Sequence, residues 1–175
     1  MTQTTIPTMT LDELSALPQA EFTAALDGIF EHSAWIPERA WAARPFANID
    51  MLHRAMTQVM RQADPAEQLA LIKAHPELAG REAAAGTLTD ASSSEQRGAG
   101  LDQCTPQELA RLRNLNAAYY RRFGFPFVIA VKGRSRHQIM DIIDERLRHD
   151  HDTEFATCLD QIIQIARFRL EAQFK

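Results

Sequence analysis

Both ends of one helix are marked in the stretch Asp64-Pro65-Ala66-Glu67-Gln68-Leu69-Ala70-Leu71-Ile72-Lys73-Ala74-His75-Pro76. Asp64 is a favoured N-cap, Pro65 suits the first helical position, and Glu67 lies near the positive end of the helix dipole. A proline disfavours helical geometry at the residue before it, so His75 lies at or just past the last helical turn. Apolar residues three and four positions earlier put the imidazole near the core-facing side. A side chain there can face a cavity.

Most of the remaining chain also has the period of amphipathic helices. Apolar residues recur at steps of three and four, and capping signals such as Thr10 with Glu13 precede several of these runs. A first short helix is expected to begin at Thr10. Further helices are expected at 22–32, 38–43, 50–61, 65–74 and 77–86. After a polar loop at 87–94, a helix is expected to begin near Ser93, followed by helices at 105–124, 135–147 and 153–174.

One run departs from the helical period, Phe125-Pro126-Phe127-Val128-Ile129-Ala130-Val131. Its composition is typical of a strand, but a single strand cannot form a sheet, and proline removes a ladder donor. We therefore expect a buried extended segment at 125–131 between helices. The predicted fold class is all-α, a helical bundle in which residues 1–175 form a single domain around one core.

Composition narrows the classes of function. The chain is 45% hydrophobic and 24% charged, as in ordinary globular proteins, and its formal net charge of −4 provides no basic field for nucleic acid or an anionic membrane. Two cysteines are too few for a disulfide framework or a four-cysteine zinc site. The stretch Met1–Pro7 lacks the basic start and apolar core of a secretory signal. We expect no nucleic-acid or membrane partner and a cytoplasmic location.

Three ionisable residues from different predicted helices could together bind and protonate an acid. They are His75, Glu95 and Arg169. Each also has a structural interpretation. A histidine at a helix end can cap it, and Ser92 with Glu95 has the spacing of a capping box at a helix start. From the residues alone, both interpretations stay open.

Arg169 lies at the edge of the apolar stripe of the last predicted helix. On a helical wheel it falls about 20° from Ile162 and about 60° from Ala166, whereas Arg167 lies further from the centre of the stripe. A guanidinium turned toward the core needs an anionic partner, because unpaired burial is costly. That partner is either a protein carboxylate or an anionic ligand.

Other candidate sites are weaker. His149-Asp150-His151-Asp152 contains metal-binding residue types, but a charged run between helices is usually a solvated connection, so we expect no metal there. Cys104 has no neighbouring base that would activate a nucleophile, and the chain has no phosphate-binding loop or dinucleotide fingerprint.

Three motifs occur in order along the chain: Ala74-His75-Pro76-Glu77-Leu78-Ala79, Ser92-Ser93-Ser94-Glu95-Gln96 and Phe123-Gly124-Phe125-Pro126-Phe127-Val128-Ile129. Their order and spacing resemble those of the 2-oxo-4-hydroxy-4-carboxy-5-ureidoimidazoline (OHCU) decarboxylases. The resemblance covers nearly the whole chain, because it also takes in Trp35, Arg44-Pro45-Phe46, Ala99-Gly100-Leu101, Lys132-Gly133 and Ile165–Leu170. Any one motif alone is weak, but three in register are specific.

The resemblance implies an all-helical lyase without a cofactor, commonly a homodimer, that acts after urate oxidase and hydroxyisourate hydrolase and forms (S)-allantoin. Carried over residue by residue, the catalytic histidine falls on His75 and the catalytic carboxylate on Glu95. Ala79 stands where some relatives have glycine. The substrate-binding positions fall on Pro76, Ser92, Gln96, Arg169 and the backbone around Phe127 and Ile129.

The implied reaction suits these residue types. Loss of carbon dioxide from C4 of the substrate leaves an electron pair that the adjacent C5 imine accepts, so the substrate carries its own electron sink. The protein has to orient the substrate and move protons. Two other interpretations are a lyase or hydrolase acting on a related ureide, and a helical binding protein in which His75 and Glu95 only terminate helices.

Overall fold

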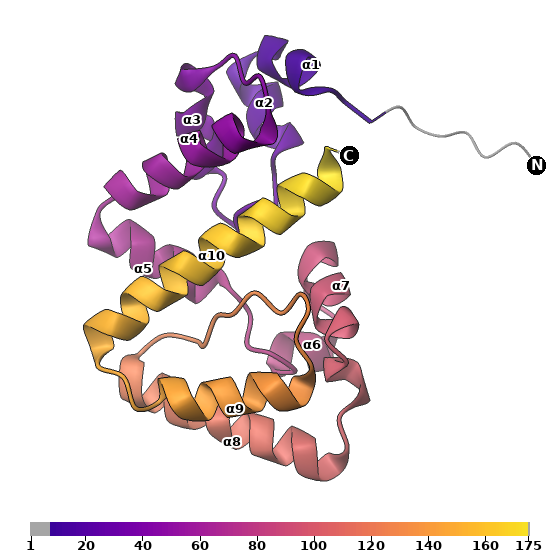
Figure 1. Ribbon diagram of the computed structural model, residues 1–175, viewed down its shortest axis with the longest axis vertical. Coiled ribbons are helices and arrows are strands. Elements are labelled where there is room, and N and C mark those ends of the chain that lie inside the picture. Colours follow the sequence, from indigo (N-terminus) through magenta and orange to yellow (C-terminus); the bar gives the residue numbers. More distant parts are fainter. Residues whose placement is uncertain (1–7, 175) are drawn as a thin grey trace, which may run out of the picture. The chain divides into compact units, whose positions relative to one another are not determined.

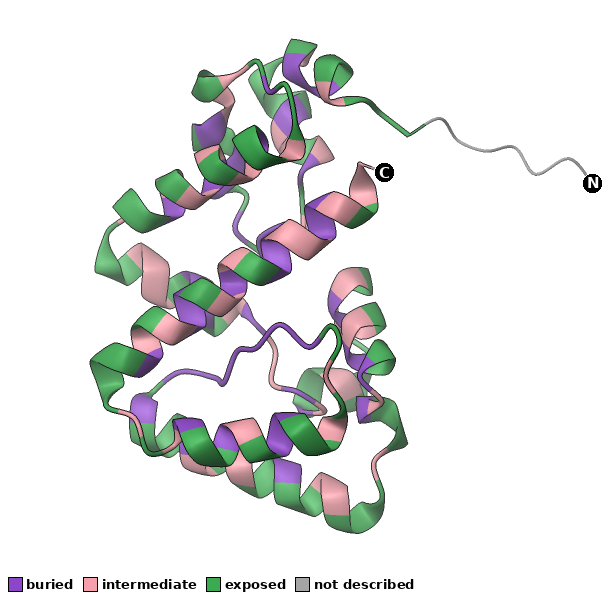
Figure 2. Ribbon diagram, in the orientation of Figure 1, coloured by how far each residue is buried: buried purple, intermediate pink, exposed green. Residues whose placement is uncertain are grey.

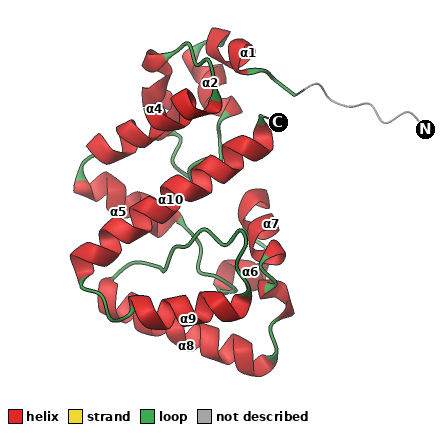
Figure 3. Cartoon of the chain, viewed as in Figure 1, coloured by secondary structure: helices red, strands yellow, loops and turns green. Residues whose placement is uncertain are grey.

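The computed structural model describes residues 8–174; Met1–Pro7, on which the expectation about a secretory signal rests, and Lys175 lie outside the described residues. The described residues divide into two compact units, residues 8–64 with 165–174, and residues 65–164. The described residues form helices joined by loops and contain no strand, so the all-α prediction is confirmed (Figure 3). The single domain stays a prediction. Between residues 8 and 174 no helix is long and apolar enough to cross a bilayer.

The first unit contains several short helices, one longer helix and part of the long C-terminal helix. They are α1 (Leu11–Ala16), α2 (Gln19–Ala25), α3 (Trp35–Ala40), the 3-10 turn η1 (Trp41–Ala43), α4 (Ile49–Gln62) and the C-terminal part of α10 (His151–Gln173). The predicted capping box is present, because Thr10 and Glu13 each accept a hydrogen bond from the other's main-chain N–H. α3 packs against α2 and α4. The apolar core of this unit includes Leu14, Phe22, Leu26, Ile36, Phe46, Leu52, Met56 and Met60.

The second predicted helix is shorter than expected. It ends at Ala25 and not at His32. Gly28 and His32 both have left-handed backbone, with φ of 84° and 47°, which breaks the right-handed helix. The brief helix expected at 38–43 begins earlier, at Trp35, and finishes as the 3-10 turn.

The second unit contains the segments that carry the three motifs. Its helices are α5 (Pro65–Ala74), α6 (Arg81–Ala85), α7 (Asp90–Gly98), the 3-10 turn η2 (Leu101–Gln103), α8 (Pro106–Phe123), α9 (Arg136–Arg146) and the N-terminal part of α10. α8 and α9 pack side by side (Figure 1). α8 stops at Gly124 as predicted, with φ of 77°. The helix expected at 77–86 is reduced to α6, because an irregular turn occupies residues 75–80.

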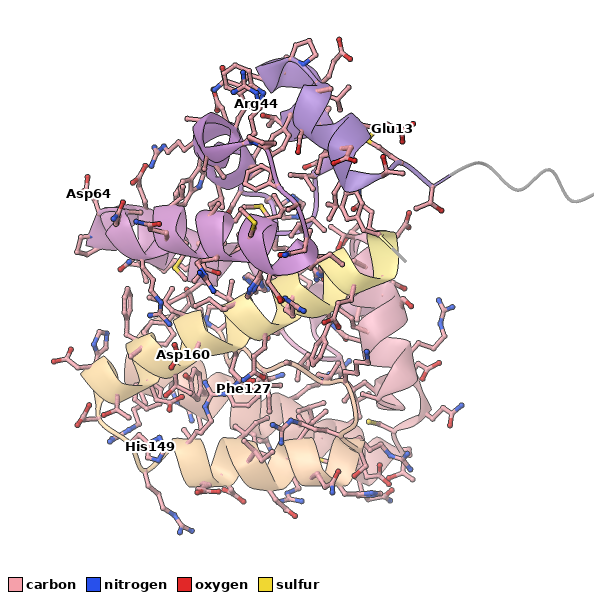
Figure 4. The ribbon with its side chains drawn as sticks, turned by 45° about the horizontal axis from the view of Figure 1, so that its top comes forward. Glu13, Arg44, Asp64, Phe127, His149 and Asp160 are labelled. Carbon is pink, nitrogen blue, oxygen red and sulfur yellow. The ribbon has the colours of Figure 1, made fainter. Side chains whose placement is uncertain are left out.

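The predicted buried segment is also confirmed. Residues 125–131 run without helix or strand between α8 and α9, and all of them are buried (Figure 2). The rings of Phe125 and Phe127 pack against Tyr119 of α8, at centroid distances of 6.1 and 5.3 Å. Figure 4 labels Phe127 among the side chains that fill this unit. Aromatic packing therefore fixes an otherwise irregular segment within the helices.

Candidate active site

The predicted helix end at His75 is confirmed. α5 stops at Ala74, and the His75 main-chain N–H donates to the Ile72 carbonyl at 3.2 Å. The side chain is buried, and its Nδ1 lies 2.9 Å from the carbonyl oxygen of Leu71. Because a carbonyl only accepts, Nδ1 carries the proton of this bond. Nε2 is then the ring nitrogen at which a proton can be gained or lost.

The turn after His75 is held by side chains from two other helices. The N–H of Ala79 donates to Oε1 of Gln96 on α7 at 2.9 Å, and the carbonyl of Leu78 accepts from Nδ2 of Asn116 on α8 at 3.0 Å. Ala79 has a φ of 48°, in the left-handed region that favours glycine. The backbone conformation would thus suit a glycine at this position.

The helix that carries Ser92, Glu95 and Gln96 begins earlier than predicted. Its first residue is Asp90, and its N-cap is Thr89, whose side chain accepts from the Ser92 N–H at 3.2 Å. The predicted capping box of Ser92 with Glu95 is therefore wrong, because both residues lie inside α7. Their spacing places Ser92, Glu95 and Gln96 on one helix face, where Ser92 and Gln96 are buried and Glu95 is half-buried. Helix capping does not account for Glu95.

The amide of Gln96 has a defined polarity. A main-chain N–H can only donate, so the atom that faces Ala79 must be the Gln96 oxygen. The amide nitrogen then points away from the Ala79 N–H, and within residues 8–174 this nitrogen makes no hydrogen bond. Gln96 can therefore offer its N–H donors to a bound molecule.

The segment at 125–131 is bound by side chains along one edge of its backbone. The partners are Arg146 Nη1 at 2.8 Å from the Val128 oxygen, Gln161 Oε1 at 3.0 Å from the Ala130 nitrogen, and Arg134 Nε at 3.2 Å from the Ala130 oxygen. In an extended chain, successive residues present their main-chain groups to opposite edges. The N–H and C=O groups of Phe127 and Ile129 belong to the other edge, and they have no hydrogen-bond partner among residues 8–174.

A buried ion pair anchors that segment. Arg146 Nε donates to Glu154 Oε1 at 2.8 Å, and both side chains are almost fully buried. The Tyr119 hydroxyl donates to the same oxygen at 2.6 Å and lies 3.4 Å from the Cys158 sulfur. Burial raises the pKa of the Tyr119 phenol and of the Cys158 thiol, so both stay protonated. The charge of Arg146 is thus balanced while its guanidinium holds Val128.

Arg169 belongs to the first unit, whereas the other predicted site residues belong to the second. It is buried, and its Nη1 donates to Glu31 Oε2 and to the Gly28 carbonyl, both at 2.7 Å. The prediction that an inward guanidinium needs an anionic partner is confirmed, and Glu31 is such a partner. Arg167 instead pairs with Asp50 and Glu171. The role of Arg169 in substrate binding stays a prediction.

Two hollows of the second unit have the turn at 75–80 in their walls. One, of about 460 Å³, is lined by His75, Glu77 and Tyr120 among others. The other, of about 380 Å³, is lined by Ala79 and Gln96 among others. His75 thus lines one of these hollows and Gln96 the other, and both residues contact the turn or belong to it.

The charged run at 148–152 is partly built into the core. His149, which Figure 4 labels where the chain passes from α9 to α10, has its Nδ1 2.9 Å from Glu154 Oε2. Within residues 8–174 no group of three His, Cys, Asp or Glu side chains could hold a metal ion. His149 extends the ion pair of Arg146 and Glu154, and the run is not purely a solvated connection.

Sequence reasoning missed Asn116, Arg146 and Glu154. Asn116 could have been found, since it lies between Leu112 and Tyr119 on the apolar stripe of α8, the same type of signal that singled out Arg169. Arg146 and Glu154 sit at the end and start of neighbouring helices within a charged region. No local pattern distinguishes that pair from surface charges.

Comparison with known proteins bears on the family and on the fold. The sequence pattern of the OHCU decarboxylase family matches residues 15–171. The chain is 39% identical to the 2-oxo-4-hydroxy-4-carboxy-5-ureidoimidazoline decarboxylase of Haloferax volcanii over 95% of this chain and 96% of that protein. It is 44% identical to the uric acid degradation bifunctional protein PucL of Bacillus subtilis, over 92% of this chain but only 32% of that protein. The chain thus spans about a third of that bifunctional relative's length.

Two solved structures are similar to this one. A crystal structure of (S)-allantoin synthase matches with a TM-score of 0.76 and 29% identity, over 95% of this chain and 54% of that one. A structure of an OHCU decarboxylase in the presence of (S)-allantoin matches with a TM-score of 0.68 over 88% of this chain and 96% of that one. At 18% identity, the second comparison shows the fold alone. The family pattern and the full-length relative together establish that this chain belongs to the OHCU decarboxylase family.

Proposed function

We propose that this protein decarboxylates 2-oxo-4-hydroxy-4-carboxy-5-ureidoimidazoline and releases (S)-allantoin in urate degradation, without a cofactor. The observation that carries the proposal is family membership along nearly the whole chain, including a relative with the decarboxylase name that matches over 95% of this chain and 96% of its own. The buried His75, with its proton position set by the Leu71 carbonyl, adds chemical support.

The reaction can be balanced without an external electron acceptor. The electron pair of the bond between C4 and the carboxylate becomes a C4=C5 double bond as carbon dioxide leaves, and the imine pair moves to nitrogen, which takes a proton. The 4-hydroxyl then gives up its proton as C4 becomes a carbonyl, and C5 receives one. Protonation of one face of C5 sets the handedness of the product. The protein has to supply orientation and proton transfer.

The roles of individual residues are part of the proposal. His75 exchanges a proton with the 4-hydroxyl or the departing carboxylate through Nε2. Gln96 donates its amide N–H groups to a substrate oxygen, because its bond to Ala79 turns the amide nitrogen away from the turn. Glu95, on the same face of α7, holds the polar edge of the ring together with Ser92.

Main-chain groups complete the proposed site. The N–H and C=O groups of Phe127 and Ile129 suit the donors and acceptors of a ureido group and a cyclic urea, and Pro76 lies beside His75. Arg169 binds an anionic or ureido oxygen. Its pairing with Glu31 supports a guanidinium of fixed orientation.

The decisive experiment is optical. Fresh substrate, made from urate with urate oxidase and hydroxyisourate hydrolase, decays spontaneously to racemic allantoin. The protein should accelerate this decay and yield one enantiomer, which circular dichroism follows directly. A racemic product at the background rate would reject the decarboxylase and favour a binding protein. Chelators should leave the accelerated rate unchanged, and inhibition by them would contradict a cofactor-independent reaction.

We also propose that the protein works as a homodimer in the cytoplasm. The family resemblance supports the dimer, and two unbridged cysteines are compatible with a reducing compartment. Light scattering behind gel filtration should give twice the chain mass of 19.7 kDa. A mass of one chain at micromolar concentration would contradict the dimer.

A further inference from the structure

One peptide of the turn after His75 is bound at both ends by side-chain amides. The N–H of the Leu78–Ala79 peptide donates to Gln96, and its C=O accepts from Asn116. Gln96 already has a proposed role toward the substrate. Asn116, on α8, has none.

Asn116 is a costly residue at its position. Only 3% of its surface is exposed, and among residues 8–174 its Oδ1 is buried without a hydrogen-bond partner. An unpaired buried oxygen is unfavourable, and what the asparagine gains in return is its hydrogen bond to the Leu78 carbonyl. The asparagine is therefore tied to this one carbonyl of the turn.

The peptide that Asn116 holds lies in a strained part of the turn. Ala79 has left-handed backbone, which a non-glycine residue adopts only where its surroundings enforce it. The bonds of Asn116 and Gln96 to the two ends of the peptide provide that enforcement. Only Pro76, with its fixed φ, and Glu77 separate His75 from Leu78, so a rotation of this peptide would be transmitted to the imidazole.

We propose that Asn116 is a positioning residue that sets the place of His75 through the Leu78 carbonyl. It has no contact with the reacting atoms and acts through the turn. This inference rests on the proposed decarboxylase function. Its measurable consequence is a loss of turnover when the amide N–H is removed, with a smaller effect on substrate binding.

The main test is Asn116→Leu, with Asn114→Leu as the matched control at an exposed position of the same helix. Asn116→Leu should reduce kcat by about 10–100-fold and change KM by less than about threefold, because the reacting groups are misplaced while the binding groups remain. Hydrogen exchange of the Ala79 amide should become faster in this variant. Asn114→Leu should leave kcat, KM and that exchange rate at wild-type values.

A second variant keeps the test informative if Asn116→Leu does not fold. In Asn116→Asp, an ionised carboxylate cannot donate to the Leu78 carbonyl, whereas a protonated one can. Burial disfavours the ionised form, so protonation should occur within reach of a pH titration. The ratio of kcat in this variant to kcat in the wild type should rise as pH falls.

The outcomes separate this proposal from the proposed function. A wild-type protein without decarboxylase activity would reject the function, and the exchange rate of the Ala79 amide would still report whether Asn116 holds the turn. An active wild type together with full kcat in Asn116→Leu would overturn the positioning role. A kcat ratio for Asn116→Asp that does not change with pH would overturn it equally.

Discussion

Gln96 and Asn116 hold opposite ends of one peptide bond, the bond between Leu78 and Ala79. Gln96 Oε1 lies 2.9 Å from the peptide nitrogen, and Asn116 Nδ2 lies 3.0 Å from its oxygen. The two amides come from α7 and α8, which joins both helices to the main chain of the turn. These two hydrogen bonds also fix the orientation of each amide, so the nitrogen of Gln96 and the oxygen of Asn116 face away from the peptide.

Mutation should separate the structural role of His75 Nδ1 from the catalytic role proposed for its Nε2. In His75→Asn, the new amide can keep donating to the Leu71 carbonyl in place of Nδ1, but it has no counterpart of Nε2. We expect His75→Asn and His75→Ala each to lose about 10²–10⁴-fold in kcat. The asparagine variant should retain a higher Tm than the alanine variant, measured by circular dichroism.

His137→Ala is the matched control, because its imidazole is exposed and lies outside the proposed site. It should turn over substrate at the wild-type rate. Near wild-type turnover in either His75 variant would remove His75 from the mechanism.

The amide polarity of Gln96 can be tested with a near-isosteric change. Gln96→Glu keeps an acceptor for the Ala79 N–H but loses the donors, so kcat/KM should fall roughly tenfold or more while the turn stays intact. Gln96→Ala should in addition lower the free energy of unfolding by about 1–3 kcal/mol, since it leaves a partly buried N–H unpaired. Steady-state kinetics and urea unfolding distinguish the two effects. An unchanged kcat/KM in Gln96→Glu would show that the amide does not donate to the substrate.

The buried ion pair should matter far more to stability than an exposed one. Arg146→Met leaves Glu154 buried without its guanidinium partner and should cost about 3–5 kcal/mol of unfolding free energy. Arg111→Met, which breaks exposed pairs with Asp141 and Asp144, should cost at most about 1 kcal/mol. Urea denaturation measures both. Similar losses in the two variants would contradict the anchoring role of Arg146.

Neighbouring positions in the turn should respond in opposite ways to the exchange of glycine and alanine. Ala79→Gly removes a side chain from left-handed backbone and should be neutral or stabilise by up to about 1 kcal/mol. Gly80→Ala would place a Cβ 2.8 Å from the Glu77 Cβ, so it should destabilise the turn. Thermal unfolding of both variants checks this pair. A destabilised Ala79→Gly would contradict backbone strain at Ala79.

The pair of Glu108 and Arg136 should contribute a pH-dependent part of stability. The hydrogen bond from Arg136 lowers the pKa of the Glu108 carboxyl below its usual value of 4.5. A carboxyl whose pKa is lower in the folded state stabilises above the unfolded pKa, and this stabilisation is lost as pH falls through the folded pKa. The Tm difference between wild type and Glu108→Gln should therefore be largest near neutral pH and disappear in acid.

The Arg136→Gln background provides the control for this prediction. Without the guanidinium, most of the pH-dependent difference caused by Glu108→Gln should vanish. A difference that persists in acid would show that the charge of Glu108 is not its source.

The elements predicted well are those whose signals are local and uncontested. Proline at both ends defined α5 and glycine ended α8, and the helix predicted from residue 135 begins with a capping box of Ser135 and Gln138. The segment at 125–131 was recognisable because strand-like composition occurred without a second strand to pair with. In each case one physical effect decided the backbone conformation.

The start of α7 was mistaken because two capping signals overlap. Thr89 and Ser92 are both good N-caps, and a start at Ser92 would give Glu95 a capping role. A start at Asp90 places a carboxylate in the first turn and buries Ser92 and Gln96 on one face. Tertiary burial, which the local pattern does not contain, decided between them.

The position of Asn116 and the pairing of Arg146 with Glu154 depend on which helices meet. Asn116 needs the Leu78 carbonyl, which lies 38 residues earlier in the chain. Periodicity can indicate that a polar residue faces inward, but its partner is determined only by the packed helices. For the candidate site, the residue types were therefore more predictable than their hydrogen bonds.

The open backbone edge at Phe127 and Ile129 has a consequence for how the protein tolerates substitution. If these groups bind substrate, the contacts come from atoms that every residue except proline possesses. Side chains at the two positions can then diverge as long as they fill the core, and alanine scanning would report packing defects in place of lost recognition. Replacing one amide by an ester, which deletes a single main-chain N–H, is the substitution that would expose this part of the site.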